Sequence, residues 1–116
     1  MTSPLRVAVV GAGPAGIHAA GFLTELAPGT VVDIFERLPG PYGLVAHGVA
    51  PDHPRIRELT GPLGEILGRP GVRLLCGVAV GADPSVAELR KRYDAVILAT
   101  GARRDVPCDL PGAGLP

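Results

Sequence analysis

The sequence predicts an α/β fold built on a Rossmann-like parallel sheet. Three observations predict it: short apolar segments alternate with segments of helical spacing, a glycine-rich turn at 11–16 directly follows the first apolar segment, and Glu36 ends the second. A strand, a helix and a second strand within about thirty residues are typical of a right-handed βαβ unit. The 116 residues fit one domain and leave no room for two.

Residues 5–36 carry the first βαβ unit. Leu5–Val10 is short, β-branched and almost wholly apolar, which is typical of a strand buried on both faces of a parallel sheet. A helix is expected over 14–27, because Pro14 suits a first helical turn, and Pro28–Gly29 ends the pattern. Val31–Glu36 is expected to be the second strand. The apolar stripe of the helix consists of Ala15, Ala19, Phe22, Leu23 and Leu26.

The middle of the chain predicts a long loop, a helix and further strand. Arg37–His53 is too long for an ordinary connection and begins with several prolines and glycines, so it is a candidate functional loop. Pro54–Gly68 has helical spacing that Gly61–Pro62 interrupts, so a kink or two short helices are expected. Val72–Cys76 and Val78–Val80 are both expected to be strand.

The last third of the chain predicts a short helix and one more strand. Asp83 is expected to cap a helix that has Pro84 at its first position and ends near Arg92. Ala95–Ala99 is wholly apolar and is expected to be another strand buried on both faces. After Gly101 the chain is polar and rich in proline, and it contains no internal repeat.

Composition and charge exclude several classes of protein. Hydrophobic residues make up 47% of the chain and charged residues 19%, so a packed core is expected and disorder is not. Eleven basic and eleven acidic residues cancel, and aromatic residues are only 3%, which argues against a nucleic-acid-binding surface. The apolar runs are far shorter than the ~20 residues of a membrane span. The N-terminus does not have the pattern of a secretory signal, so a cytoplasmic location is expected.

The cysteines and histidines predict no metal site. Cys76 and Cys108 form no Cys-x-x-Cys pair, and the three histidines are scattered without the spacing of zinc ligands. Cys76 is expected to pack as a small apolar side chain in a strand. His18 is expected to be structural or exposed to solvent.

The turn Gly-Ala-Gly-Pro-Ala-Gly at 11–16 fits the pattern G-x-G-x-x-G. It follows a buried strand, opens a helix and precedes an acidic residue at the end of the next strand, which is the context of a dinucleotide-binding fingerprint. Gly11 permits the tight turn, Gly13 lets a pyrophosphate approach the backbone, and Gly16 lets helix and strand pack closely. The helix N-terminus offers N–H groups and partial positive charge, so the phosphates need no lysine or arginine. A glycine turn without a ligand is the alternative.

Glu36 is the acidic partner of this turn. Its carboxylate can accept hydrogen bonds from both hydroxyls of an adenosine ribose. It would repel the 2′-phosphate of NADP, so this first site is expected to take FAD or NAD. Arg37, the next residue, is a candidate for stacking on adenine or contacting phosphate, although an exposed arginine after a strand is the commoner arrangement.

Longer stretches of the sequence carry a family resemblance. The glycine turn with Glu36 resembles the FAD-binding start of flavoproteins that have two dinucleotide-binding domains. Residues 35–45 (Phe-Glu-Arg-Leu-Pro-Gly-Pro-Tyr-Gly-Leu-Val) and 48–54 (Gly-Val-Ala-Pro-Asp-His-Pro) are similar to the adrenodoxin reductase family, bacterial NADPH–ferredoxin reductases included. Residues 77–80, 92–97 and 99–101 fall where that family has its next FAD-contacting segments. The resemblance covers the chain from about residue 5 to 116.

The resemblance implies the FAD-binding half of an enzyme that passes electrons from NADPH through FAD to a ferredoxin-type iron–sulfur protein. The flavin converts a two-electron hydride into single electrons, and the protein holds and tunes it. The glycine-turn pattern and the resemblance together give these candidate cofactor-binding residues: Gly11, Gly13, Pro14, Ala15, Gly16, Glu36, Arg37, Leu44, Val80, Thr100 and Gly101.

Four assignments in this set come from the resemblance alone. The backbone of Leu44 would face the flavin side of FAD, Val80 would line its adenine end, and Thr100–Gly101 would end the last strand against the cofactor. The alternatives are loop packing for Leu44 and an ordinary turn after the strand. The resemblance places His53 near the nicotinamide–flavin site, where it would position cofactor or relay a proton, since imidazole titrates near neutral pH. A helix cap is the alternative for His53.

The sequence also lacks parts that the family has. No second glycine-rich turn for NADP occurs, and the C-terminal segment that closes over the flavin is missing. Residues 1–116 are therefore expected to be an N-terminal FAD-binding fragment that is not catalytic by itself. The alternatives are a flavoprotein like the small subunit of glutamate synthase, a classical NAD dehydrogenase domain, and a non-catalytic FAD- or nucleotide-binding module.

Overall fold

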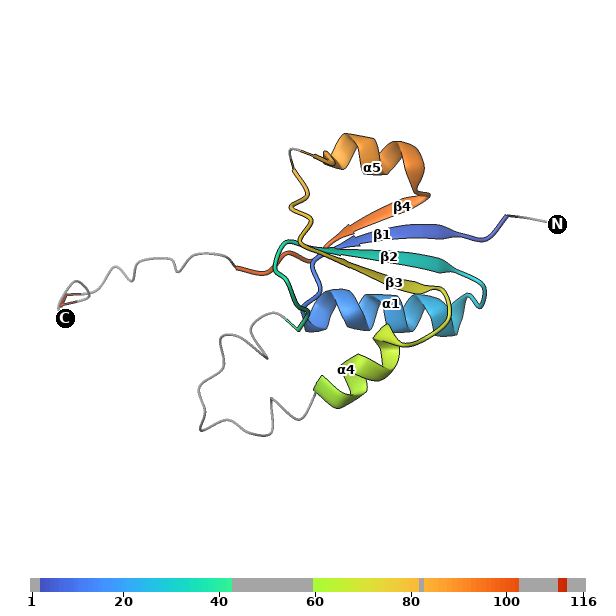
Figure 1. The fold of residues 1–116 in the computed structure, drawn as a ribbon, viewed down its shortest axis with the longest axis horizontal. Helices are drawn as coiled ribbons and strands as arrows, with labels where there is room; N and C mark the ends of the chain where they lie inside the picture. Colours follow the sequence, from blue (N-terminus) through green and yellow to red (C-terminus); the bar gives the residue numbers. More distant parts are fainter. Residues whose placement is uncertain (1–2, 43–59, 82, 103–110, 113–116) are drawn as a thin grey trace.

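A computed structural model describes residues 3–42, 60–81, 83–102 and 111–112. Within them, four strands form a parallel sheet in the order β3-β2-β1-β4 (Figure 1). This is the predicted Rossmann-like α/β fold. The strands are β1 (Arg6–Val10), β2 (Val31–Glu36), β3 (Val72–Cys76) and β4 (Ala95–Leu98).

The register of the sheet places β1 at its centre. Val9 of β1 lies opposite Ile34 of β2 on one side and Ile97 of β4 on the other. Because all pairs are parallel, the carboxyl ends of the strands meet at one edge of the sheet. The turns that leave β1, β2 and β4 gather at this edge, which is where ligands bind in open α/β sheets.

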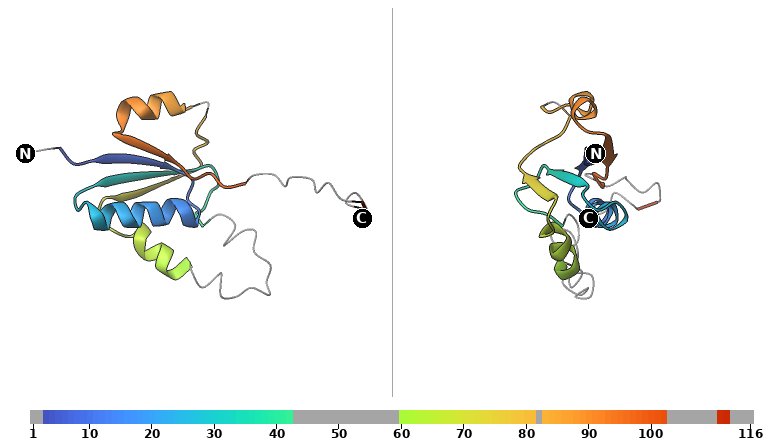
Figure 2. Two further views of the ribbon diagram at one scale, coloured as in Figure 1. Left: turned by 180° about the vertical axis from the view of Figure 1, so that it is seen from behind. Right: turned by 90° about the vertical axis from the view of Figure 1, so that its right-hand side faces the viewer.

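Helices cover both faces of the sheet (Figures 1 and 2). Helices α1 (Pro14–Leu26) and α4 (Thr60–Leu67) lie on one face, and α5 (Val86–Arg92) lies on the other. The alternation of side chains along each strand separates two cores. The core beneath α1 and α4 contains Val7, Val9, Ile17, Ala20, Val32, Ile34, Leu63 and Ile66. The core beneath α5 contains Ala8, Val10, Phe35 and Leu89.

Helix α1 packs through a face other than the predicted stripe. Its buried residues are Ile17 and three small residues, Gly16, Ala20 and Gly21. Phe22 and Leu26, which the stripe included, are 61% and 83% exposed. The reason is close approach: a Cβ on Gly21 would lie 2.9 Å from the Cδ1 of Ile66 in α4, so large side chains do not fit between these helices.

Three further predictions about the elements were wrong. Val78–Val80 is not strand, because the chain leaves the sheet after Cys76 and crosses toward α5. Ser85 rather than Asp83 caps α5, since its side chain accepts a hydrogen bond from the Glu88 N–H at 3.1 Å. Strand β4 lies at an edge of the described sheet, and so its residues are half-buried or exposed instead of fully buried.

Helix α4 passes through Gly61 and Pro62 without a break. It begins at Thr60, so Pro62 lies in its first turn, where a missing N–H costs no intrahelical hydrogen bond. The earlier part of the predicted helix, residues 54–59, lies outside the described residues. None of the helices among the described residues is long and apolar enough to cross a membrane.

Candidate nucleotide-binding site

The turn after β1 requires glycine at two of its three pattern positions. Gly11 has a φ of +112°, in a region that side chains rarely adopt, and its N–H donates to the carbonyl oxygen of Phe35 at 2.8 Å. A Cβ on Gly11 would overlap the carbonyl oxygen of Ala99, which follows β4. A Cβ on Gly16 would overlap the carbonyl oxygen of Gly11 itself. The turn is therefore packed closely between the end of β4 and the first turn of α1, and the glycine pattern predicts such close packing of helix and strand.

The N-terminus of α1 opens toward the same edge of the sheet. Gly13 is its N-cap residue and has no side chain that could cap the helix, and the first turn contains no acidic residue. Pro14 begins the helix, and Ala15 after it is exposed. Among the described residues, no side chain caps this end of the helix, so its N–H groups suit an anionic group such as a pyrophosphate.

Glu36 lies against this turn, at the carboxyl end of β2. It is 7% exposed, and its two carboxylate oxygens accept from different loops: Oε1 from the Ala12 N–H at 2.9 Å, and Oε2 from the Leu38 N–H at 3.0 Å. Each oxygen keeps a second lone pair, so the fixed carboxylate can still accept two hydroxyl groups. This geometry fits the hydroxyls of a ribose.

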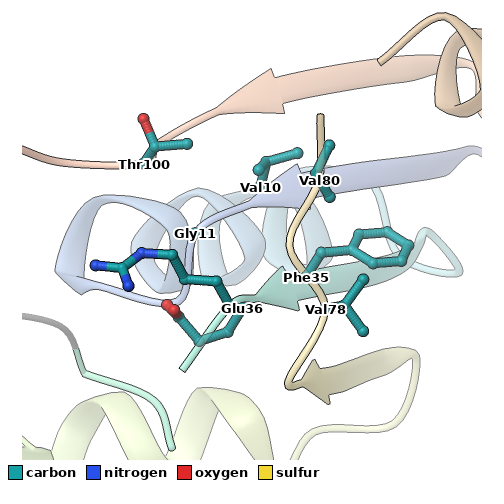
Figure 3. Close-up of a pocket in the computed structure, with 8 residues that line it drawn as sticks. Val10, Gly11, Phe35, Glu36, Val78, Val80 and Thr100 are labelled. Atoms are coloured by element: carbon teal, nitrogen blue, oxygen red, sulfur yellow. The ribbon is translucent and has the colours of Figure 1, made fainter. Parts of the chain in front are cut away.

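A hollow opens beside the turn, between the ends of β1, β2 and β4 (Figure 3). Phe35, Val78 and Val80 form its apolar wall, and the carboxylate of Glu36 points toward its opposite side. The cavity has a volume of about 30 Å³, which is space for no more than about two water molecules. An aromatic base therefore requires side chains at the rim to move. The residues that line the hollow are Val10, Gly11, Phe35, Glu36, Arg37, Val78, Val80 and Thr100.

The structure brings together most of the predicted site residues. Arg37, Val80 and Thr100 line the same hollow as Gly11 and Glu36, although they come from three different connections. Gly101 follows Thr100 with a φ of +68°. Leu44 and His53 lie outside the described residues, so their placement stays a prediction.

Sequence reasoning missed three residues of the hollow: Val10, Phe35 and Val78. Val10 and Phe35 belong to strands, where apolar residues are expected in the core rather than at a site. The signal that points to Val78 is the alternation in Gly77-Val-Ala-Val80, which places Val78 and Val80 on one side of an extended segment.

Titratable groups beside the hollow do not form a metal site. Among the described residues, no cluster of three or more histidine, cysteine or acidic side chains is close enough to hold an ion. Cys76 lies opposite Glu36 in the sheet, and burial, together with the charge of Glu36, raises the pKa of its thiol. The reactive thiolate of Cys76 is therefore disfavoured at neutral pH.

Comparison with known proteins agrees with this geometry. A family model described as pyridine nucleotide-disulphide oxidoreductase matches residues 5–115. The mitochondrial NADPH:adrenodoxin oxidoreductase of Drosophila melanogaster is 41% identical over 109 residues, which are 94% of this chain and 23% of that protein. The NADPH-ferredoxin reductase FprA of Mycobacterium leprae is 42% identical over 116 residues, which are 96% of this chain and 25% of that protein.

Solved structures give the same result. FprA of Mycobacterium tuberculosis, in complex with NADPH, superposes with a TM-score of 0.88 and is 41% identical. That match covers 97% of this chain and 26% of the FprA chain. The chain thus spans about a quarter of the length of the relatives it matches.

Proposed function

The chain belongs to the pyridine nucleotide-disulphide oxidoreductase family, and on that premise we propose that it is the N-terminal FAD-binding part of an NADPH–ferredoxin reductase of the adrenodoxin reductase type. In this proposal electrons pass from NADPH through FAD to a ferredoxin-type iron–sulfur protein. The proposal assigns the NADP-binding site and the C-terminal FAD segment of such a reductase to residues other than these 116. The observation that carries the proposal is Glu36, a buried carboxylate fixed beside an uncapped helix N-terminus.

The pyrophosphate of FAD is proposed to lie at the turn between β1 and α1. Gly11 and Gly13 leave the backbone accessible, and the first turn of α1, with Pro14, Ala15 and Gly16, directs its dipole at the phosphates. The two hydroxyls of the adenosine ribose would donate to Glu36. No lysine or arginine is needed for this, which is consistent with a chain of zero net charge.

The adenine is proposed to enter the hollow beside Glu36. Val80 would contact one side of the ring, and Thr100 with Gly101 would border it from the end of β4. Arg37 has a long, exposed side chain with a planar guanidinium at the rim, so it is the one expected to move and stack on the base. Leu44 is proposed to face the flavin and His53 to act at the nicotinamide–flavin site. These two roles rest on the family resemblance.

The proposal is tested with the full natural polypeptide that carries residues 1–116. We expect the purified protein to show the absorbance spectrum of an oxidised flavin, and the released cofactor to be FAD by chromatography. NADPH is expected to bleach that spectrum, and a ferredoxin-type protein to restore it. A colourless protein that takes up no FAD on reconstitution would overturn the assignment.

Substitution of Glu36 tests the ribose contact. Glu36→Ala is expected to raise the Kd for FAD at least tenfold, because two charge-assisted hydrogen bonds are lost. The measurement is quenching of flavin fluorescence on titration of the apoprotein. Glu25→Ala, an exposed glutamate on α1 with one surface ion pair to Arg69, is the matched control and should leave the Kd unchanged. An unchanged affinity in Glu36→Ala would show that Glu36 does not hold the ribose.

A further inference from the structure

A group of charged and aromatic residues crosses the α5 face of the sheet, at a distance from the glycine turn. We call it the sheet brace; it consists of Arg6, Asp33, Arg73, Tyr93 and Asp94. Every strand contributes to it, since Arg6 begins β1, Asp33 lies in β2, Arg73 in β3, and Tyr93 and Asp94 directly precede β4.

Asp33 is the centre of the brace. Its side chain is 1% exposed, yet three donors satisfy it. Arg73 donates from Nε and Nη2 to the two carboxylate oxygens, each at 2.9 Å, and the Tyr93 hydroxyl donates to Oδ2 at 2.5 Å. Loss of the tyrosine hydroxyl would therefore leave Asp33 paired with Arg73, whereas loss of Asp33 would leave a charge unpaired.

The ring of Tyr93 is held from three directions. Its hydroxyl is bound by Asp33, and the guanidinium of Arg6 lies 5.3 Å from the ring centroid. Its ring is perpendicular to that of Phe35, with a centroid distance of 6.2 Å and an interplanar angle of 89°, the favourable edge-to-face arrangement. Tyr93 thus has little freedom to move relative to β2.

Phe35 connects the brace to the candidate site. One side of its ring forms the apolar wall of the hollow with Val78 and Val80 (Figure 3). Phe35 also lines a second hollow of about 160 Å³, together with Leu75, Leu89 and Tyr93 and with the charged residues Glu88 and Arg92. A hollow of this size can admit an aromatic ring. The contact with Tyr93 therefore keeps the Phe35 ring in the wall of the first hollow, although the ring also borders the second one.

We infer that Tyr93 is a positioning residue for the adenosine side of the nucleotide site, acting through Phe35. This inference rests on the proposed function and adds to it a residue that lies outside the hollow. Once the hydroxyl no longer binds Asp33, the Tyr93 ring is held less firmly. Phe35 can then turn toward the second hollow, and the wall that faces the base loses its shape.

The test is Tyr93→Phe in the full natural polypeptide. This substitution keeps the aromatic ring and removes only the hydroxyl. The Kd values for FAD and for ADP are measured by fluorescence quenching and by calorimetry at 10 °C, well below the unfolding transition. Both are expected to rise by the same factor, about three- to tenfold, since the change is confined to the adenosine side that the two ligands share.

Two controls separate positioning from a structural role. Ser85→Ala removes the cap of α5 and is expected to lower the melting temperature without changing either Kd, because the folded fraction stays near one at 10 °C. In a double-mutant cycle, Tyr93→Phe is expected to have no further effect on Kd once Phe35→Leu is present.

The outcomes are distinguishable. An unchanged or lower Kd in Tyr93→Phe, or effects of Tyr93→Phe and Phe35→Leu that simply add, would overturn the positioning role while wild-type binding upholds the FAD site. A wild-type protein that binds neither FAD nor ADP would overturn the proposed function, and this inference with it.

Discussion

Gly16 is a residue whose missing side chain decides how closely α1 approaches β1. Gly16→Ala would force the new Cβ into the Gly11 carbonyl oxygen and to 3.1 Å from the Val9 side chain. Because the first obstacle is backbone, we expect a loss of about 2–3 kcal/mol in the free energy of unfolding. Urea titration followed by circular dichroism measures it.

Gly61→Ala is the matched control for Gly16→Ala. Nothing lies within 4 Å of a Cβ at Gly61, which is in the first turn of α4. Alanine there is expected to be neutral or to stabilise the protein by up to about 1 kcal/mol, because glycine is the weaker helix former. Equal destabilisation by the two substitutions would show that α1 is not packed as described.

Asp33 predicts how stability depends on pH. Burial alone would raise the pKa of its carboxyl group, but hydrogen bonds from Arg73 and Tyr93 and the charges of Arg73 and Arg6 outweigh it, so the pKa is lowered below 3.8. A carboxyl group whose pKa is lower in the folded than in the unfolded protein stabilises the fold at pH values above its unfolded-state pKa. This stabilisation is lost as the pH falls through the folded-state pKa.

The expected result is a steeper loss of melting temperature below about pH 4 in the wild type than in Asp33→Asn. Melting curves between pH 6 and pH 2.5 measure it. At pH 6 the variant is expected to be the less stable protein, since Arg73 loses its carboxylate partner. Parallel pH profiles would show that Asp33 is not the group responsible.

The residues of the site differ in how visible they are in the sequence. Gly11, Gly16 and Glu36 could be assigned because their spacing is set by local geometry of one turn and the next strand. Phe35 and Tyr93 could not be assigned in this way. They are 58 positions apart in the sequence and meet only because the register of β2 and the approach of α5 bring their rings together. Side chains that act through a neighbour leave no local pattern.

At the scale of the elements, the stability of α5 depends on Ser85, the N-cap residue directly before the helix. Ser85 accepts from the Glu88 N–H, and its hydroxyl lies 3.2 Å from the Glu88 carboxylate, while Glu88 also lies near the positive helix end. Ser85→Ala is expected to cost about 1 kcal/mol of unfolding free energy.

Asp83→Ala is the comparison for Ser85→Ala in α5. Asp83 is two residues before the cap and exposed, so its loss is expected to change the unfolding free energy by less than about 0.5 kcal/mol. Thermal unfolding of both variants measures the difference. A larger effect at Asp83 would restore the capping role that the sequence alone suggested.

The types of the elements could be predicted, but the faces they bury could not. Leu5–Val10 and Val31–Glu36 have the composition of buried strands, and residues 7–10 and 32–36 within them are buried. Helix α1 offers two apolar faces, and its pattern favoured the one with Phe22 and Leu26. Contact with α4 selected the small residues instead, and that contact comes from a helix more than thirty residues later.

At the scale of the whole molecule, the parallel sheet gathers residues 11, 36, 80 and 100 at one edge. The adenosine side of the proposed FAD site is therefore present in these residues, whereas a site for the hydride donor is proposed to lie in another domain. A chain ending at Pro116 is expected to reduce no ferredoxin with NADPH, whereas the full natural polypeptide is proposed to do so. Steady NADPH oxidation by the short chain, measured at 340 nm with acceptor present, would contradict this division.

The pairing of β1 with β4 also sets the order in which the sheet is completed during synthesis. At the start of this pair the Asp94 N–H donates to the carbonyl oxygen of Arg6, and the Asp94 carboxylate accepts from the Arg6 N–H. The two residues are 88 positions apart in the sequence. At roughly 5–20 residues per second, a ribosome needs about 4–18 s to make the intervening chain. During that interval β2 is the one strand of the described sheet next to β1 that has been made, so the other side of β1 lacks its partner. The central strand of the fold is thus the strand with the longest wait for its second partner, and it is the one that a chaperone or a neighbouring nascent chain would meet.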